Sequence, residues 1–519
     1  MPPVRCSWVL ISSIRQGLRL SGGVSRASMS LEKSHTAISR IFSMSLTTLR
    51  KLLPLGLNSR YYYHDFEPEL GSGSTLLIPD RPVFQAVSRA VPASPLSRVF
   101  NFAMLGSSMI GGTMSNALKN GFSGSWSDFA MNEDNIDRLA EGLLKMRGAA
   151  LKLGQFMSFQ DNSKVPSALM KAMERTRREA YVMPEVQVEM VMRKNFGKSW
   201  REMYDSFEIM PFAAASIGQV HKAVYKGVPV AVKIQYPGVA DSIDSDLGNL
   251  KKLITWTNLI PRGLFVDEMI ESIRIDLKNE CDYLLEAQHQ KRFRQFLADK
   301  PEYEIAEVFD EVTGTQVLTS SFLTALTLEE FAAKADQKLR DSVGTRIMGL
   351  TLREIFEFKY MQTDPNPANF QYNPIKDTLQ LLDFGATRSF GKDFLELYKK
   401  LVISGIEEDY EAALKWSYEI KYLNGKENQA MIDAHVHSLF TVGEPFRTPG
   451  LYDFGKQSIT DKVYKHLPTM MQHRECPPPP ETYTLHRKLS GAFLLCMQLK
   501  ARVPGRKLFQ ELVRNSELT

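Results

Sequence analysis

Apolar residues recur at helical spacing over residues 136–157 of the chain. Ile136, Leu139 and Leu143 open a stripe whose intervals alternate between three and four residues to the end of that range. Asn132 precedes the stripe and is a good N-cap, because its side chain can accept a hydrogen bond from the first backbone N–H groups. The pattern predicts an amphipathic helix that packs on another part of the protein.

A second pattern alternates between two faces, as a β-strand does. Val230-Ala-Val-Lys233 follows Gly227 and Pro229 and ends on a lysine. A strand with β-branched residues on one face and Lys233 on the other presents that lysine to a separate site.

A longer helical stripe lies downstream, with Ile270, Ile273, Leu277 and Leu284 on one face. Asp267 is expected to cap this helix, and the stripe predicts one continuous helix as far as Leu284 and beyond. The acidic segment Glu280 to Glu286 belongs to it.

The second half of the chain is mainly helical. Residues 313–328 are strand-like, and helical spacing dominates 331–359, 392–470 and 485–499. His486 lies in the last of these ranges and is expected to be a cap or a surface group rather than a ligand. Strands followed by a long helical region indicate an α+β fold with two lobes.

Twenty uncharged residues lie between Arg98 and Lys119, which is just enough for a helix to cross the hydrocarbon core of a bilayer. Ser108 and Gly112 are four residues apart, a spacing that lets two helices approach closely in lipid. The segment 98–119 therefore predicts a single transmembrane or membrane-embedded helix, with a buried or interfacial helix as the alternative. Its small residues make it a candidate surface for a homodimer.

Charge changes this picture most at the N-terminus. Residues 1–60 contain nine Lys or Arg, many Ser and a single acid, Glu32. Acid-poor, Arg- and Ser-rich leaders are typical of mitochondrial transit peptides, with a disordered basic tail as the alternative. A linker punctuated by Pro and Gly follows over residues 61–97.

The whole chain has 519 residues, 43% hydrophobic content and a net charge of +5. That length and content support substantial folded cores. Basic residues form no long runs, so no nucleic-acid partner is implied. The four Cys lie far apart without a Cys-x-x-Cys pair, which argues against a disulfide framework or structural zinc.

The main candidate chemistry lies in residues 360–388. Asp364 and Asn369 are five residues apart, and Asp383 opens an Asp-Phe-Gly triplet fourteen residues after Asn369. Protein kinases place a catalytic-loop Asp and Asn at that interval and follow them with the metal-binding Asp of Asp-Phe-Gly. Mg²⁺ prefers oxygen ligands, so these residues predict a site for ATP and Mg²⁺. Gln362-Thr-Asp364 replaces the His-Arg-Asp of ordinary kinases, so regulation by loop phosphorylation is not expected.

A small-residue loop precedes Lys233 and resembles the kinase phosphate loop. Residues 212–221 read Phe-Ala-Ala-Ala-Ser-Ile-Gly-Gln-Val-His, and their alignment with Gly-x-Gly-x-x-Gly-x-Val puts alanine at two of the three glycine positions. Alanine cannot approach phosphates as freely as glycine, so the loop should be stiffer. The residues expected to cover the phosphates are Ala213, Ala214, Ala215, Ser216, Gly218 and Val220. In kinases, the lysine at the position of Lys233 contacts the α and β phosphates and pairs with a helix Glu.

The helix around residue 150 carries a further motif. Ala149-Ala-Leu-Lys152-Leu-Gly-Gln155 matches the Lys-x-Gly-Gln motif of the UbiB family of atypical kinase-like proteins. Six motifs follow one another in the order typical of UbiB proteins: this motif, the alanine-rich loop, Val-Ala-Val-Lys, the acidic helix, Asp364 to Asn369, and Asp-Phe-Gly. From about residue 130 to its end, the chain resembles the mitochondrial branch of that family, which supports coenzyme Q biosynthesis.

The resemblance implies roles for the three acids near residue 283. Glu286 is expected to pair with Lys233, whereas Glu280 and Asp282 are expected to meet Lys152 and Gln155 and so exclude a polypeptide substrate. An exchange of the Glu280 and Glu286 roles is the alternative.

The resemblance also implies the domain division. We expect an atypical protein-kinase-like fold with two lobes and a family-specific helical extension: extension 128–205, N-lobe 206–328 and helical C-lobe 329–519.

The function implied is that of an ATP-binding protein, an ATPase rather than a protein kinase, required for coenzyme Q biosynthesis at the matrix side of the mitochondrial inner membrane. Asp364 would orient the attacking water or hydroxyl, and Asn369 and Asp383 would hold Mg²⁺. Implied partners are the enzymes of that pathway, membrane lipids and coenzyme Q precursors. A genuine protein or small-molecule kinase and a non-catalytic scaffold remain the alternatives.

Overall fold

The structure is a computed structural model, and it describes residues 76–78, 87–88, 107, 181–257, 266–457 and 459–514. The chain divides into two units, Met1–Leu70 and Gly71–Thr519, and every described residue belongs to the second. The expected transit peptide, the membrane segment apart from Ser107, and the helix with Lys152 and Gln155 lie outside the described residues. Within those described, no helix has the length and apolarity needed to cross a membrane.

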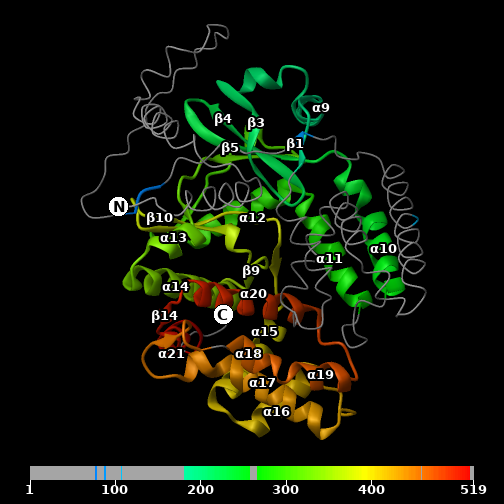
Figure 1. Cartoon of the computed structure of the whole chain (residues 1–519), viewed down its shortest axis with the longest axis vertical. Helices are drawn as coiled ribbons and strands as arrows, with labels where there is room; N and C mark the ends of the chain where they lie inside the picture. The colour runs from blue at the N-terminus through cyan, green and yellow to red at the C-terminus, as the bar shows by residue number, and fades with distance from the viewer. Residues whose placement is uncertain are drawn as a thin grey trace, which may run out of the picture. The chain divides into compact units, whose positions relative to one another are not determined.

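An antiparallel four-stranded sheet forms the first lobe, here called the N-lobe (Figure 1). Val230, Val232 and Ile234 alternate along one strand and are fully buried on one face of the sheet, which leaves Lys233 on the other face. The strands, in their spatial order, are β3 (Ser206–Ala214), β4 (Gly218–Tyr225), β5 (Val228–Gln235) and β7 (Val317–Ser321).

The buried face of this sheet is covered by α9 (Glu185–Phe196) and the 3-10 turn η1 (Trp200–Met203). Val188 and Trp200 are fully buried there against the β5 side chains. Before α9, β1 (Val87–Ser88) pairs in parallel with β2 (Tyr181–Val182). The end of the region expected as a helical extension therefore completes the N-lobe core.

Three helices follow β5, namely α10 (Val239–Thr257), α11 (Val266–Glu280) and α12 (Tyr283–Phe296). The prediction of one continuous helix through Glu280 and Leu284 was wrong, because the chain breaks between α11 and α12. Asp282 has extended backbone angles and its side chain accepts a hydrogen bond from the Leu285 N–H at 3.0 Å, so it caps a new helix.

Short strands connect the two lobes. One sheet has the order β6-β11-β10-β8, and β9 pairs with β12 beside it. Strands β10 and β11 form a hairpin in which Phe370 pairs with Leu381, so the residues just before and just after this hairpin lie together. The bounds are β6 (Tyr303–Ile305), η3 (Asp310–Val312), β8 (Leu326–Thr327), β9 (Tyr360–Gln362), η5 (Pro367–Asn369), β10 (Phe370–Asn373), β11 (Thr378–Leu381) and β12 (Thr387–Ser389).

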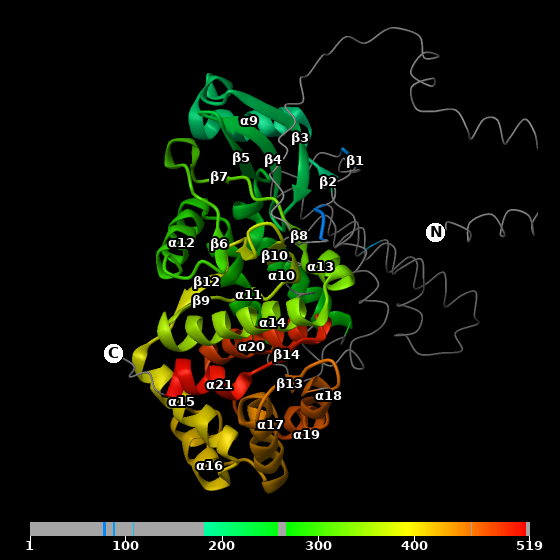
Figure 2. The same cartoon turned by 90° about the vertical axis from the view of Figure 1, so that its left-hand side faces the viewer.

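Helices make up the second lobe, here called the C-lobe. Figure 2 shows α14 and α20 between the strands above them and helices α15 to α19 and α21 below them. Val343, Ile347 and Leu350 are buried along α14, as their spacing predicted. The elements are α13 (Leu328–Lys334), α14 (Gln337–Leu352), η4 (Arg353–Glu357), α15 (Lys392–Glu407), α16 (Tyr410–Glu419), α17 (Gln429–Arg447), β13 (Tyr452–Asp453), α18 (Ile459–Tyr464), α19 (Leu467–His473), α20 (Pro480–Gln498), β14 (Arg502–Val503), α21 (Gly505–Phe509) and η6 (Gln510–Arg514).

The start of α20 differs from the sequence prediction. The helix begins at Pro480, the last of four consecutive prolines, which lies five residues before the range 485–499 expected to be helical. Proline fits the first helical turn, because its fixed φ suits a helix and its missing N–H would have no partner there.

Candidate active site

Lys233 lies between two carboxylates from different parts of the chain. Its Nζ is 2.8 Å from Glu286 Oε1 on α12 and 3.5 Å from Asp383 Oδ2, which follows β11. The Glu286 side chain is 2% exposed, so its charge depends on this partner. The ion pair expected between Lys233 and Glu286 is thus present, and it also reaches Asp383.

The two acids and one lysine shift each other's pKa values. Burial raises the pKa of Glu286 to about 7; Lys233 opposes this shift, and the nearby charge of Asp383 adds to it. Burial alone would lower the pKa of Lys233, but Asp383 and Glu286 raise it well above its usual value. One cation shared by two carboxylates explains both directions: the lysine stays protonated, while a second negative charge beside it is penalised.

The alanine-rich loop is a tight turn between β3 and β4. The Ala215 N–H donates to the Gly218 carbonyl at 2.9 Å, and Ala213 pairs with Val220 in the ladder. None of residues 213–218, all of them described, has a positive φ, so alanine fits this backbone without strain. Gly218 is needed for another reason, since a Cβ there would lie 2.4 Å from the Ile234 carbonyl oxygen.

Glu280 joins this loop to the helices. Ser216 Oγ donates to Glu280 Oε2 at 3.3 Å, and Glu280 is buried. A Cβ on Gly385 of the Asp-Phe-Gly triplet would lie 3.2 Å from Glu280 Cγ and 3.4 Å from Glu286 Oε2. The helix break at Asp282 is what lets Glu280 and Glu286 converge on one space, although their spacing on a single helix would separate them.

Asp364 and Asn369 form one compact loop before β10. Asn369 Nδ2 donates to the Asp364 carbonyl oxygen at 3.2 Å, and the Leu382 N–H donates to the Asn369 carbonyl at 2.9 Å. These bonds hold Asn369 next to the residue that precedes Asp383. The amide nitrogen of Asn369 is thereby occupied, and its oxygen, the atom a cation requires, is not used by that bond.

Asp383 has a left-handed backbone with φ of 31°, which is uncommon outside glycine. Its carbonyl oxygen accepts from Gln362 Nε2 at 3.3 Å, and its Oδ1 accepts from the Gly385 N–H at 3.0 Å. Gln362, in the place of the His of His-Arg-Asp, therefore supports the Asp-Phe-Gly turn.

The residues that could hold Mg²⁺ supply only some of the oxygen ligands that the ion needs. Asn369 and Asp383 offer one amide and one carboxylate oxygen group, and no group of three or more His, Cys, Asp or Glu suited to a metal exists in the described ranges. Mg²⁺ commonly binds through one or two protein oxygens with phosphate oxygens and waters as its other ligands. The donor set suits a metal that arrives with a nucleotide.

Sequence reasoning missed an arginine from the far end of the chain. Arg487 of α20 donates through Nε to the Thr363 carbonyl at 3.1 Å and through Nη2 to Thr363 Oγ1 at 3.2 Å. Asp276 of α11 is 1% exposed and pairs with both Arg487 at 3.1 Å and Arg388 at 2.5 Å. A guanidinium therefore lies beside Thr363, which stands where ordinary kinases have an arginine. That guanidinium is already paired with Asp276.

A buried ion pair supports the same loop from behind. Lys488 Nζ lies 2.6 Å from Glu354 Oε2, and the two side chains are 2% and 1% exposed. The Gln362 N–H donates to the other oxygen of Glu354 at 3.2 Å. The only sequence signals for Arg487 and Lys488 were two charges on an otherwise apolar helix.

Of the four expected gating residues, Glu280 and Asp282 are described. Asp282 is the exposed N-cap of α12, and Glu280 contacts Ser216 as above. Whether either one meets Lys152 or Gln155 lies outside the described residues.

A sheet lobe with a lysine–glutamate ion pair, joined to a helical lobe with an Asp–Asn loop and an Asp-Phe-Gly turn, defines a protein-kinase-like fold. A family model described as "ABC1 atypical kinase-like domain" matches residues 175–417. The chain belongs to this family of atypical kinase-like proteins, the UbiB family, and the resemblance found in the sequence is confirmed.

Two similar relatives are mitochondrial by name. Atypical kinase COQ8, mitochondrial, of Saccharomyces cerevisiae is 43% identical over 434 residues, which cover 82% of this chain and 86% of the relative. Atypical kinase COQ8B, mitochondrial, of Danio rerio is 42% identical, with 83% of this chain and 71% of the relative covered.

Among solved structures, the Rv3197–erythromycin complex from Mycobacterium tuberculosis is similar with a TM-score of 0.51 and 24% identity. The match covers 73% of this chain and 96% of that one, and it supports the fold alone.

Proposed function

We propose that this protein binds ATP with Mg²⁺ and hydrolyses it in support of coenzyme Q biosynthesis. The observation that carries the proposal is Lys233, which joins Glu286 and Asp383 across the two lobes at 2.8 and 3.5 Å. This geometry places a fixed cation beside the carboxylate expected to hold the metal, as phosphoryl transfer requires.

Each role follows from position. Lys233 would hold the α and β phosphates, and residues 213–218 would cover them. Asn369 and Asp383 would hold Mg²⁺, which neutralises phosphate charge when bound. Asp364 would orient the attacking water.

Three features favour water over a protein as the phosphoryl acceptor. Thr363 stands where a kinase has an arginine, and the neighbouring Arg487 is bound to Asp276. The loop of residues 213–218 is alanine-rich and tied to Glu280. The Lys-x-Gly-Gln helix, with Lys152 and Gln155, would close the protein-substrate face together with Glu280 and Asp282.

The cellular setting is proposed from the relatives and the leader. Relatives named mitochondrial and the acid-poor residues 1–60 favour mitochondrial import. Residues 98–119 would attach the protein to the inner membrane from the matrix side, near the pathway enzymes and lipid precursors, and could also pair two copies. The leader hypothesis fails if the mature protein isolated from cells begins at Met1 in the cytosol.

Two variants test the site. Asp383→Asn should abolish binding of Mg-ATP, measured by titration calorimetry, because the metal loses its carboxylate. Asp364→Asn should keep the affinity within about threefold and lower hydrolysis by roughly 10²–10⁴, the usual contribution of a positioned acid–base group. Asp393→Asn, on the exposed start of α15, is the matched control and should change neither quantity. Unchanged Mg-ATP affinity in Asp383→Asn would show that the metal assignment is wrong.

A further inference from the structure

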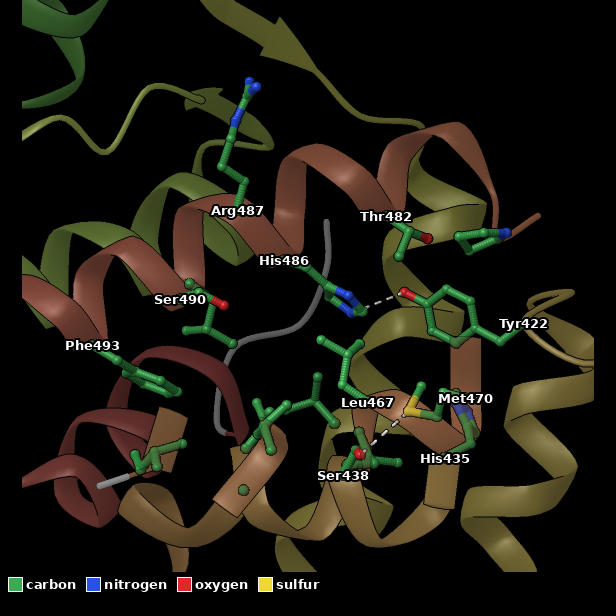
Figure 3. Close-up of a pocket in the computed structure, with 18 of the residues that line it drawn as sticks. Tyr422, His435, Ser438, Leu467, Met470, Thr482, His486, Arg487, Ser490 and Phe493 are labelled. Carbon is green, nitrogen blue, oxygen red and sulfur yellow. Dashed lines mark hydrogen bonds between the residues drawn. The ribbon is translucent and has the colours of Figure 1, made fainter. Parts of the chain in front are cut away.

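The C-lobe contains a cavity that the proposed active site does not use. Helices α15, α17, α18, α19 and α20 line it, its volume is about 350 Å³, and most of its wall is apolar (Figure 3). Small-molecule sites generally have volumes of roughly 300–1,000 Å³, apolar walls and a few placed polar groups. The cavity has the size and wall of a ligand site.

Empty space, rather than a packed core, lies inside it. His486 and Ser490 of α20 both point into the cavity (Figure 3), yet both side chains are exposed. Their exposed surface therefore faces the cavity. His486 was expected to be a cap or surface group, and it does not cap α20, whose N-cap is Pro479.

Two residues of the lining carry hydrogen-bond donors that are not used. Arg474 Nη1 and Thr482 Oγ1 are buried and have no hydrogen-bond partner among the described residues, and both side chains line the cavity. A buried donor without an acceptor is costly, most of all on a charged group. The structure thus leaves an acceptor site next to a positive charge.

Burial lowers the pKa of Arg474, and the charge of Glu427, which lies outside the lining, opposes this shift. The Glu427 oxygens already accept from the Asn424 N–H at 3.0 Å and the Gly425 N–H at 2.9 Å.

Burial lowers the pKa of His435 to about 3. The surrounding helices desolvate His486 and lower its pKa to about 4, although its side chain keeps surface open to the cavity, so both rings are neutral near pH 7. No acidic side chain is found among the described residues of the lining, and its second arginine, Arg487, is bound to Asp276. Arg474 is the cation left for a ligand.

We propose that this cavity binds a small amphiphile with an anionic oxygen head group, of the chemical class of medium-chain carboxylates. The head group accepts from Arg474 and Thr482, and the apolar tail lies against side chains such as Leu467, Met470 and Phe493. The charge of Arg474 selects an anion over an alcohol or an amine of the same length.

The cavity shares α20 with the catalytic loop. Thr482, His486 and Ser490 line the cavity, whereas the guanidinium of Arg487 points away from it and binds Thr363 (Figure 3). One turn further on, Gly491 packs so closely on Pro365 that a Cβ would lie 2.1 Å from the proline Cβ. A ligand that shifts α20 therefore moves the residues on both sides of Asp364, a coupling that rests on the proposed nucleotide function.

Binding is tested on the full-length chain without nucleotide, by titration calorimetry with decanoate below its micelle concentration. We expect saturable binding of one decanoate, with decanol and decylammonium at least tenfold weaker. Arg474→Met and the cavity-filling Leu467→Trp should each weaken decanoate at least tenfold. Lys465→Met and Leu451→Trp, two exposed positions outside the cavity, are the matched controls and should leave binding unchanged.

Equal binding of decanol or decylammonium to the unaltered chain, or no saturable binding, overturns the site even if a variant fails to fold. Coupling is tested separately: saturating decanoate should change the Mg-ATP dissociation constant at least threefold, and ATP should change decanoate affinity by the same factor. An unchanged Mg-ATP dissociation constant overturns the coupling but does not affect the proposed decanoate site. Absence of Mg-ATP binding without decanoate would instead contradict the proposed function.

Discussion

At the scale of single residues, Lys233 balances two carboxylates and can neutralise only one of them. Glu286 is 2% exposed, so it depends on the lysine far more than Asp383, whose side chain is 33% exposed. The pKa of Glu286, raised to about 7 by burial, shows how close this carboxyl is to taking up a proton. The ion pair is therefore both a structural and a functional contact.

Replacement of Lys233 by methionine should destabilise the fold in a pH-dependent way. Without the lysine, a buried charge loses its partner, which typically costs about 3–5 kcal/mol. The folded-state pKa of Glu286 lies above its unfolded value, so protonation of this carboxyl favours the folded state. That contribution to the free energy of unfolding is full at low pH and is lost as pH rises through the folded pKa. Denaturant unfolding should therefore show a larger loss at pH 8 than at pH 5.5.

Lys376→Met is the matched control, because its partner Glu304 lies 2.7 Å away and the lysine is largely exposed. This change should cost no more than about 1 kcal/mol at either pH. An equal loss for Lys233→Met at both pH values would contradict the account of Glu286.

His221 on β4 gives a second pH dependence, of opposite sign. Burial lowers its pKa to about 4, although its ring bonds the Glu208 carbonyl at 2.9 Å. A histidine with a depressed pKa stabilises the folded state above its unfolded pKa of 6.5, and that stability is lost as pH falls toward 4. The loss should be about 3 kcal/mol for this group. His221→Gln should flatten the pH dependence of unfolding in that window, and an unchanged slope would contradict the prediction.

At the scale of elements, the close approach of a neighbouring strand's backbone explains the glycine at position 218, where the backbone conformation does not require one. Gly218→Ala would place its Cβ 2.4 Å from the Ile234 carbonyl oxygen and 2.8 Å from the Tyr283 hydroxyl. Backbone must shift there, so we expect a loss of about 1–3 kcal/mol. Gly248→Ala in α10 has open space and should stabilise by about 0.5–1 kcal/mol. Thermal unfolding of both variants checks the contrast, and similar effects would contradict it.

Gly491→Ala tests the support of the catalytic loop by α20. The new Cβ would clash with Pro365, the residue after Asp364. We expect turnover to fall at least tenfold while Mg-ATP affinity changes less, because Lys233 and Asp383 are untouched. Steady-state hydrolysis and calorimetry together measure this, and a loss confined to affinity would contradict it.

The elements also show which parts of the site a sequence can predict. Asp364, Asn369 and Asp383 are close in the sequence and flank one hairpin, so their spacing was enough to predict that they meet. Arg487 is 124 residues from Thr363 and 211 from Asp276, and only the folded C-lobe brings them together. The break before α12 was missed because the apolar stripe continues through Asp282, while the capping bond that ends the helix depends on one side chain.

At the scale of the whole molecule, the two lobes share a buried apolar core, in which Phe293 of α12 packs on Tyr360 and Phe384, and charged contacts join them around the candidate site. Lys233 reaches Asp383 from the N-lobe, and Asp276 of α11 binds Arg388 and Arg487. The kinase-like fold and the family followed from motif order, because each motif sits on its own local element. What the sequence leaves open is the destination of the phosphoryl group.

The most direct measurement of the central claim follows ATP labelled on its γ-phosphate with the purified full-length protein, with and without membranes rich in anionic lipid. We expect free phosphate that increases with the membranes and is lost in Asp383→Asn, with little label on protein. Stoichiometric transfer of label to a partner protein or lipid, or no turnover under any condition, would contradict this claim.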